Sequence, residues 1–412
     1  MKSIFTPSFD VVISRRKFIS RFVQASFIGI LFPVNSRGAV VTSEPNFLSD
    51  LLERAQDGEN VEVPAGRYIL KRPLILNGRS IIINGGGKVD LIVTGSNDAA
   101  ISIENSKDVV IDGINIMAAN DCRAGVSLDA CSNVKLANMV IRNFREAGVE
   151  VRKSINCSIE KSKFYDSALD HRWPEPASSD VFINGTNSHI SVSSCLHASM
   201  GGYAIQIRTN KAGEESIGHV ISANNISGYN SYGIMLYRNG PYYPGDDQTV
   251  SNITLRGNVV RSISGSRSAN PNKQDIKDFG AGIYLQGAES CLVEDNVIDG
   301  TNAATNTELL APGAIGIANS GAEIIRNNKI SNCRYGIYIN DSLGKGRPDG
   351  VIDILGNSFR SVRKLCIKIV AKDNVNISGS SYDVGPEKFM QKFGGHKNMI
   401  MNNIRQMNNK EF

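Results

Sequence analysis

The sequence is poor in tryptophan and proline, with one tryptophan and 13 prolines among 412 residues, and it lacks a long apolar run. The apolar stretch 22–32 covers 11 residues, whereas a membrane-spanning helix needs about 20. EF-hand, P-loop and HExxH spacings are absent, so none of these sites is indicated. The seven cysteines form no CxxC pair and have no histidine at zinc spacing, which favours buried free thiols over a disulfide framework.

The N-terminus has the features of a targeting segment. Residues 14–20 read SRRKFIS and resemble the twin-arginine export signal of bacteria. An apolar run and the small residues at 36–39 follow, which predicts cleavage near Gly38. We therefore expect residues 1–38 to be a signal peptide and the twin-arginine machinery to be a partner. The folded mature protein is then periplasmic or secreted and has no transmembrane segment.

The net charge of +5 depends on this N-terminal segment. Six of the 45 basic residues and one of the 40 acidic residues precede residue 39, so 39 of each sign remain after cleavage. A neutral mature protein has no overall positive field that would attract nucleic acid. We therefore expect no nucleic-acid partner.

An internal repeat dominates the rest of the chain. Each copy has a small residue followed by alternating aliphatic residues, and a second short strand follows, which predicts short strands with an apolar inner side. No helical stripe separates the strands, so a doubly wound fold is excluded and a coil of stacked parallel strands is indicated. The copies are 124–128, 147–151, 179–183, 203–207, 232–236, 281–285, 313–317 and 335–339.

A column of asparagines falls at the turn after the second strand of successive repeats, where we expect left-handed backbone and a hydrogen-bonded ladder. The column consists of Asn225, Asn258, Asn296, Asn328 and Asn357.

With the strand–Pro-Ala-Gly–x–Tyr opening at 61–68, the repeats resemble the right-handed parallel β-helix proteins of the pectate-lyase-like superfamily. The resemblance implies an all-β fold, a single right-handed parallel β-helix.

The predicted domain boundaries follow from the extent of this pattern. The β-helix covers 61–385 in about ten turns, behind an N-terminal cap at 39–60 that contains a short helix at 47–55. Residues 386–412 are rich in asparagine and lysine, and we expect them to form a loose cap or a disordered tail.

If the aliphatic residues of each repeat point inward, the residues between and after them point outward in two rows. The first outward row is Ser127, Glu150, Phe182, Gln206, Met235, Tyr284, Gly316 and Tyr338. The second outward row is Asp129, Arg152, Asn184, Arg208, Tyr237, Gln286, Ala318 and Asn340. Charged, amide and aromatic side chains in this mixture suit a sugar chain, although the outer side of a sheet is polar by default.

Insertions interrupt the repeat after Tyr165, Arg238, Ser264 and Gly300, and long loops on a repeat scaffold usually line the binding face. The substrate-binding candidates from the outward rows, their neighbours and the first insertion are Arg238, Arg152, Glu150, Asp180, Gln206, Trp173, Tyr284 and Gln286. The second insertion contains Asp246 and Asp247, which either bind calcium with a third oxygen ligand or are ordinary solvated turn residues.

The catalytic candidates are His171, Tyr237, Arg208 and Asp170. Elimination and C5 epimerisation of uronates both begin with removal of the proton alpha to a carboxylate, which requires a base beside a cation. Hydrolysis instead requires two carboxylates, which Glu150, Asp166, Asp170 and Asp180 could supply. The Asp-Pro-His motif of alginate epimerases and the polygalacturonase motifs are missing. A polysaccharide lyase or epimerase, a non-catalytic polysaccharide-binding scaffold and a glycoside hydrolase therefore remain as hypotheses.

Overall fold

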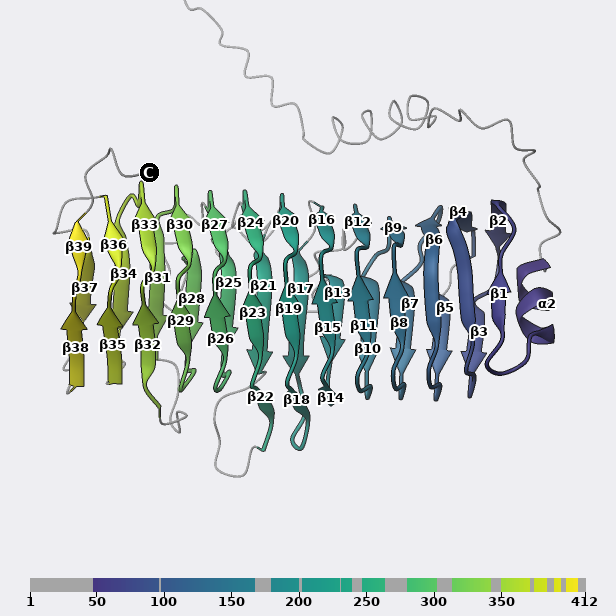
Figure 1. Cartoon of the computed structure of the whole chain (residues 1–412), viewed down its shortest axis with the longest axis horizontal. Helices are drawn as coiled ribbons and strands as arrows, with labels where there is room; N and C mark the ends of the chain where they lie inside the picture. The colour runs from purple at the N-terminus through teal and green to yellow at the C-terminus, as the bar shows by residue number, and fades with distance from the viewer. Residues whose placement is uncertain are drawn as a thin grey trace, which may run out of the picture. The chain divides into compact units, whose positions relative to one another are not determined.

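A computed structural model describes most of the chain from Phe47 onward, and the described residues belong to one compact unit, Thr42–Phe412. The described ranges are 47–95, 98–166, 179–199, 202–229, 231–238, 247–263, 280–301, 313–341, 350–370, 374–383, 389–393 and 398–406. Almost every element in them is a strand, and the strands stack in parallel (Figure 1).

Each coil of the stack contributes one strand to each of three columns. The first column is a 12-stranded sheet in which every strand pairs in parallel with its counterpart in the next coil. Its strands are β3 (Leu74–Asn77), β5 (Ala99–Glu104), β7 (Ala124–Asp129), β10 (Ala147–Arg152), β13 (Ser179–Asn184), β17 (Tyr203–Thr209), β21 (Tyr232–Arg238), β25 (Ala281–Gln286), β28 (Ile315–Ala318), β31 (Tyr335–Asn340), β34 (Leu365–Val370) and β37 (Met390–Phe393).

The second and third columns together form a 24-stranded sheet, and the long strands β4 (Ile82–Val93) and β6 (Val110–Ala118) run through both. The second column continues with β1 (Asn60–Glu62), β8 (Lys135–Ala137), β11 (Ser158–Glu160), β15 (Ser191–Ser193), β19 (Val220–Ser222), β23 (Thr254–Arg256), β26 (Leu292–Glu294), β29 (Ile324–Arg326), β32 (Ile352–Leu355), β35 (Asn374–Ser378) and β38 (Asn398–Asn402). The third column continues with β2 (Gly66–Leu70), β9 (Val140–Arg142), β12 (Lys163–Tyr165), β16 (Leu196–Ala198), β20 (Asn225–Ser227), β24 (Val259–Arg261), β27 (Val297–Asp299), β30 (Lys329–Ser331), β33 (Ser358–Arg360), β36 (Ser381–Tyr382) and β39 (Arg405–Gln406).

A third, small sheet extends from the coils in the middle of the stack. It consists of β14 (Asn187–Ser188), β18 (Glu215–Ile217) and β22 (Thr249–Ser251), again in parallel. Strands β18 and β22 contact β17, and β22 also contacts β21, so the small sheet adjoins the C-terminal ends of these two strands of the first column.

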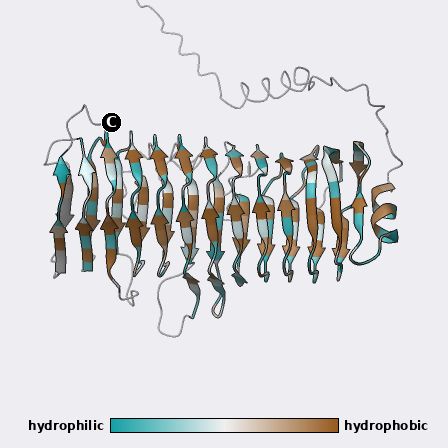
Figure 2. Cartoon of the chain, viewed as in Figure 1, coloured by the Kyte–Doolittle hydropathy of each residue, from teal (hydrophilic) through white to brown (hydrophobic). Residues whose placement is uncertain are grey.

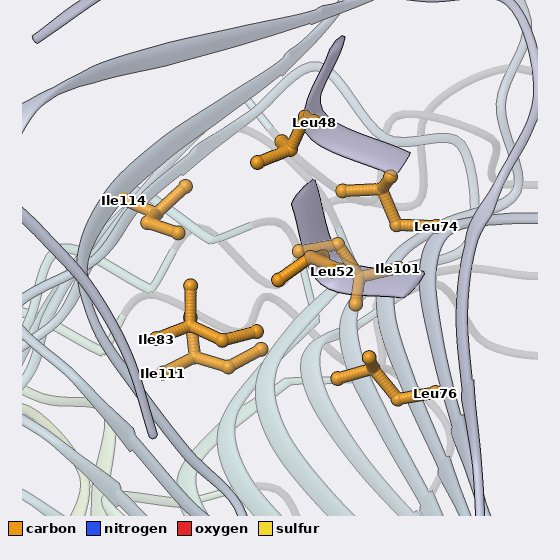
Figure 3. Close-up of a pocket in the computed structure, with 8 residues that line it drawn as sticks. All are labelled: Leu48, Leu52, Leu74, Leu76, Ile83, Ile101, Ile111 and Ile114. Carbon is orange, nitrogen blue, oxygen red and sulfur yellow. The ribbon is translucent and has the colours of Figure 1, made fainter. Parts of the chain in front are cut away.

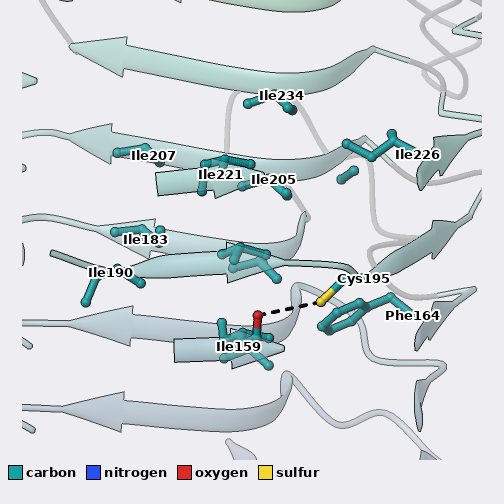
Figure 4. Close-up of a cluster of buried hydrophobic side chains, with 14 of the residues drawn as sticks. Ile159, Phe164, Ile183, Ile190, Cys195, Ile205, Ile207, Ile221, Ile226 and Ile234 are labelled. Carbon is teal, nitrogen blue, oxygen red and sulfur yellow. Dashed lines mark hydrogen bonds between the residues drawn. The ribbon is translucent and has the colours of Figure 1, made fainter. Parts of the chain in front are cut away.

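The aliphatic residues of the repeats form one continuous core. Val149, Val151, Ile205 and Ile207 are fully buried, as the alternation predicts, and apolar residues recur from coil to coil along the stack (Figure 2). Figure 4 shows the interior of the middle coils, where side chains from all three columns pack together. The sequence-based prediction of a single parallel β-helix is therefore confirmed.

The first coil is covered by the predicted cap helix. Helix α2 (Phe47–Arg54) turns its two buried leucines, Leu48 and Leu52, toward Leu74, Leu76 and the isoleucines of the first coils (Figure 3). A parallel coil leaves apolar side chains and unpaired backbone groups at its end, so an amphipathic helix at this position protects both.

The asparagine ladder exists, but it begins at Asn224 rather than Asn225. Each Nδ2 donates to Oδ1 of the next asparagine, at 2.9–3.0 Å, along Asn224, Asn258, Asn296, Asn328 and Asn357. The expected left-handed backbone is also displaced by one position, since it occurs in the residue before each ladder asparagine. That preceding residue makes the turn, which leaves the asparagine free to point inward.

The C-terminal segment extends the coil further than the sequence indicates. Strands β37, β38 and β39 pair in parallel with β34, β35 and β36, although residues 386–412 look like a polar tail. Pairing depends on the backbone groups of the preceding strands, which a polar segment satisfies as well as an apolar one. The stack, with its 12-stranded sheet, is therefore longer than about ten turns.

All seven cysteines are buried and free, as the sequence analysis predicts. Burial raises the pKa of the Cys157 thiol to about 11 and that of Cys195 to about 12, so these thiols stay protonated and behave as small apolar side chains.

Within the described ranges, none of the helices is long and apolar enough to cross a membrane.

Close stacking of the coils makes glycine necessary at Gly336. A Cβ atom there would lie 2.4 Å from the carbonyl oxygen of Cys366 and 2.7 Å from the ring of Phe359. We expect Gly336→Ala to lower the free energy of unfolding by about 2 kcal/mol or more, because backbone cannot move aside within a packed stack. Chemical denaturation checks this expectation. Gly78→Ala is the control for an open position, since a Cβ there meets nothing within 4 Å and only the positive φ opposes the substitution. A loss in Gly336→Ala no larger than in that control would contradict the packing argument.

Candidate functional site

The outer side of the 12-stranded sheet carries both outward rows in the register expected from the repeat. Glu150 pairs with Ser127 and Phe182 in the first outward row. Arg208 pairs with Asn184 on one side and Tyr237 on the other in the second outward row. The repeat therefore positions these residues correctly, one coil apart.

The first outward row is buried, although it projects from the outside of the coil. Glu150 is 3% exposed, and Gln206 and Tyr284 are each 1% exposed. Arg238, at the end of β21, is 4% exposed. These four side chains are therefore enclosed in the structure rather than solvated, and their role in substrate binding stays a prediction.

Glu150 is held by two arginines. Its Oε2 atom lies 2.7 Å from Arg123 Nη1, and its Oε1 atom lies 3.9 Å from Arg152 Nη1. Arg152 also lies 3.4 Å from Asp129. Glu150 and Arg152, both substrate-binding candidates, are thus engaged with other charged residues of the first coils.

The second outward row is partly exposed around Arg208, Tyr237 and Gln286. The Arg208 guanidinium lies over the Tyr237 ring, 5.5 Å from its centroid, so these two catalytic candidates meet. Gln286 accepts a hydrogen bond of 2.9 Å from the Tyr284 hydroxyl. Arg208, Tyr237 and Gln286 are called the Arg208 cluster below.

Arg208 differs from the arginines of the neighbouring coils. In the part of the chain that the structure describes, no carboxylate lies within 4.0 Å of it, and its buried Nε has no hydrogen-bond partner. The adjacent Thr209 Oγ1 and Asn210 Oδ1 are likewise buried without a partner among the described residues. A half-buried guanidinium without an anion is a binding group for a carboxylate.

A group of tyrosines adjoins the Arg208 cluster, and only Tyr284 among them is a candidate from the sequence. Tyr232 stacks on Tyr203 and on Tyr284, with ring centroids 5.5 and 4.9 Å apart. Further along the stack, the Lys368 ammonium lies 4.6 Å from the ring centroid of Tyr338. The signal was present in the sequence, because a tyrosine opens the repeats at 203, 232 and 335. Burial raises the pKa of Tyr284, so its hydroxyl stays protonated and can act only as a hydrogen-bond donor or acceptor.

Asp180 does not lie on the outer side of the sheet, contrary to the sequence-based prediction. Its side chain is 0% exposed and points into the coil, where it contacts His197 and Tyr229. The physical reason is that Asp180 is the second residue of β13, where the alternation of inward and outward side chains has not yet begun. At Gly148, the equivalent residue one coil earlier, an added Cβ would lie 2.8 Å from the ring of Phe164, inside the coil.

The described histidines other than His197 have structural surroundings. His219 is buried, and its Nδ1 accepts a hydrogen bond of 3.0 Å from the Ile190 backbone. Burial lowers the pKa of His219 to about 3, so its ring is neutral.

The remaining predicted site residues lie outside the described residues. They are Asp170, His171 and Trp173 of the first insertion, and Asp246 of the possible calcium pair. Its neighbour Asp247 is described, and Asp247 Oδ1 accepts a hydrogen bond of 2.5 Å from the Gly213 backbone. No group of three histidine, cysteine, aspartate or glutamate side chains within the described ranges is arranged to hold a metal ion.

The family model described as a right-handed beta helix region matches residues 179–404. The chain belongs to the right-handed β-helix family. No curated protein matches this family member in sequence. The match begins at β13, so it includes the Arg208 cluster and every coil after it.

Solved structures resemble this β-helix protein in fold. The mannuronan C-5 epimerase AlgE4 A-module of Azotobacter vinelandii is 14% identical, with a TM-score of 0.62 over 83% of this chain and 91% of that chain. An alpha-1,3-glucanase from Streptomyces thermodiastaticus is also 14% identical, with a TM-score of 0.63 over 89% of this chain and 66% of its own. The periplasmic alginate epimerase AlgG is 12% identical, with a TM-score of 0.52 over 87% of this chain and 83% of that chain. At these identities the likeness concerns the fold.

Proposed function

We propose that this protein is an exported carbohydrate-active protein that binds an acidic, uronate-containing polysaccharide at the Arg208 cluster and processes it by β-elimination or C5 epimerisation. The observation that carries the proposal is Arg208, which is partly exposed and has no carboxylate partner among the described residues. Tyr237, which lies under the Arg208 guanidinium and is also partly exposed, offers an aromatic ring for contact with a sugar. Export rests on the twin-arginine-like segment at 14–20.

The proposed chemistry uses two groups that lie one coil apart. Arg208 binds the carboxylate of a uronate residue and stabilises the negative charge that develops on it when the C5 proton leaves. Tyr237, whose ring the guanidinium covers, is the candidate base, and in its phenolate form it accepts that proton and becomes a phenol. Departure of the C4 oxygen then completes elimination, whereas return of a proton to the opposite side of C5 completes epimerisation. His171 remains a candidate for the second proton transfer.

Hydrolysis has less support from the described carboxylates. Asp180 lies inside the coil, and Glu150 is paired with Arg123. Two of the four carboxylates that hydrolysis could use are therefore held away from a ligand. Non-catalytic binding remains the alternative that uses the same Arg208 cluster.

The test is incubation of the purified protein with polymannuronate, alginate, polygalacturonate and a neutral glucan as control. Ultraviolet absorbance detects unsaturated uronates, NMR in deuterated water detects exchange at C5, and a reducing-end assay detects hydrolysis. We expect one of the first two signals on a uronate polymer only. Binding without either signal would favour the non-catalytic alternative, and absence of binding to every uronate polymer would refute the proposal.

Tyr237→Phe separates binding from catalysis. We expect this variant to lose about 100-fold or more in turnover, because the phenolate oxygen that accepts the proton is gone. Binding should persist, since the ring under Arg208 remains. Rates and binding isotherms are compared with those of Tyr335→Phe, which removes a hydroxyl from another tyrosine of the same face. Equal turnover in the two variants would exclude Tyr237 as the base.

A further inference from the structure

Three polar side chains meet inside the coil. Asp180 lies in β13, His197 is the middle residue of β16, and Tyr229 follows β20. All three are 0% exposed. The Tyr229 hydroxyl donates to Asp180 Oδ2, and the same oxygen lies 3.1 Å from His197 Nδ1. The His197 ring stacks on Phe164, with centroids 4.8 Å apart and planes 3° from parallel.

These polar residues occupy positions that the repeat fills with apolar or small residues elsewhere. His197 pairs with Phe164 in the preceding coil and Ile226 in the following one, both drawn among the core side chains in Figure 4. Asp180 takes the place that Gly148 has one coil earlier. The coils therefore stack without such a network, and buried polar groups are costly. Their convergence at one point indicates a role beyond packing.

Strand β13 connects this network to the outer side of the sheet. Ser179, the neighbour of Asp180, donates a hydrogen bond of 3.1 Å to the Gln206 side chain. At the other end of β13, Asn184 pairs with Arg208 in register. A change in the position at which β13 begins would therefore move side chains that flank Arg208.

The ionisable groups around Asp180 allow one variable proton. Burial raises the pKa of the Asp180 carboxyl, and burial together with Asp180 raises the pKa of Tyr229, so the tyrosine keeps its proton. Asp166 is the other nearby acid, and the Cys195 thiol, with a pKa of about 12, is neutral. Asp180 Oδ1 and His197 Nε2 have no partner among the described residues. The Asp180 carboxyl, 3.1 Å from His197 Nδ1, is thus the group of this network whose proton can change.

We propose that Asp180, His197 and Tyr229 are positioning residues, and that the proton shared by Asp180 and His197 fixes the place at which β13 reaches the outer side of the sheet. Ligand binding at Arg208 then depends on a network that no ligand touches. This dependence rests on the proposed function, whereas the placement of β13 does not.

The placement of β13 is tested without ligand by hydrogen exchange and mass spectrometry on Asp180→Asn, Tyr229→Phe and the matched control His219→Asn. In the control, an amide oxygen replaces the buried Nδ1 acceptor of a histidine that does not touch Asp180. We expect exchange of segment 179–184 to rise about tenfold in the first two variants and to stay near the wild-type rate in the control. A rise in segment 179–184 no larger than that in segment 281–286 overturns the proposal.

The shared proton is tested by the melting temperatures of the wild type and Asp180→Asn between about pH 4 and 8. Because the pKa of Asp180 is raised on folding, the folded state holds this proton more tightly than the unfolded chain. The resulting stabilisation is complete below the unfolded carboxyl pKa of about 3.9 and is lost as the pH rises through the folded pKa. We therefore expect the wild type to lose melting temperature relative to the variant as the pH rises. A difference in melting temperature that stays constant with pH overturns the proposal that Asp180 and His197 share a proton.

The link to the site is tested by oligouronate binding to the wild type, Tyr229→Phe and His219→Asn. We expect about tenfold weaker binding to Tyr229→Phe and unchanged binding to the control. Normal binding by Tyr229→Phe, with altered exchange at 179–184, would disprove the link. If the wild type binds no uronate polymer, the proposed function fails, and the exchange and melting data still decide whether the network positions β13.

Discussion

Asn296→Ala is expected to lower the free energy of unfolding by about 3 kcal/mol or more. Asn296 is fully buried in the middle of the ladder. Its Nδ2 donates to the Leu255 carbonyl and to Asn328, and its Oδ1 accepts from the backbone N–H and the Nδ2 of Asn258. Alanine leaves these groups buried without a partner, and each such group costs about 1–3 kcal/mol.

The measurement is denaturant unfolding, with Asn225→Ala as the matched control. Asn225 is exposed and directly follows the first ladder asparagine, Asn224, so the control removes the same side chain from the outside of the coil. We expect the control to stay within about 0.5 kcal/mol of the wild type. Similar losses in both variants would show that the ladder contributes little beyond ordinary packing.

Arg208→Ala is expected to weaken uronate binding about 100-fold, equivalent to about 3 kcal/mol. A hydrogen-bonded contact between a guanidinium and a carboxylate has this magnitude when the site is partly desolvated. Arg208→Lys should recover only part of the affinity, because an ammonium cannot form the paired, parallel hydrogen bonds of a guanidinium. Binding isotherms with an oligouronate at two salt concentrations measure both effects, and the wild-type affinity should fall as salt increases.

Arg256→Ala controls for the loss of a positive charge. Arg256 lies on β23 of the second column, with 58% of its side chain exposed, so it belongs to another side of the coil. We expect this variant to bind like the wild type. Equal losses in the two alanine variants would indicate non-specific attraction of the polymer, and no loss in Arg208→Ala would place the binding site elsewhere.

The repeat correctly predicted the positions that depend on the alternation of inward and outward side chains along a strand. Arg208 and Tyr237 meet because each follows an aliphatic residue that is fixed in the core, Ile207 or Leu236, and one residue further along the strand faces outward. The asparagine ladder was displaced by a single position because it forms at a turn, where the alternation ends. Asp180 was misplaced for the same reason, since it lies at the start of β13, where the alternation has not yet begun.

The sequence did not predict how deeply the outer rows are buried. Alternation determines on which side of a sheet Gln206 or Tyr284 lies, but not whether another part of the chain covers that side. The network around Asp180 also escaped prediction, because Asp180 and His197 come from different columns of one coil and Tyr229 comes from the next coil. Only the register of the columns shows that these three departures from the apolar repeat coincide.

The seven enclosed thiols have a consequence for biogenesis. An unfolded chain presents seven cysteines to any oxidising catalyst, whereas the finished coil presents none of them, because all are buried. Incorrect disulfides can therefore form only before folding. A chain that folds in a reducing compartment and crosses the membrane already folded would pass through this vulnerable stage before it meets an oxidant. Folding before transport would then act as redox protection, and the odd number of cysteines would carry no penalty outside the cell membrane.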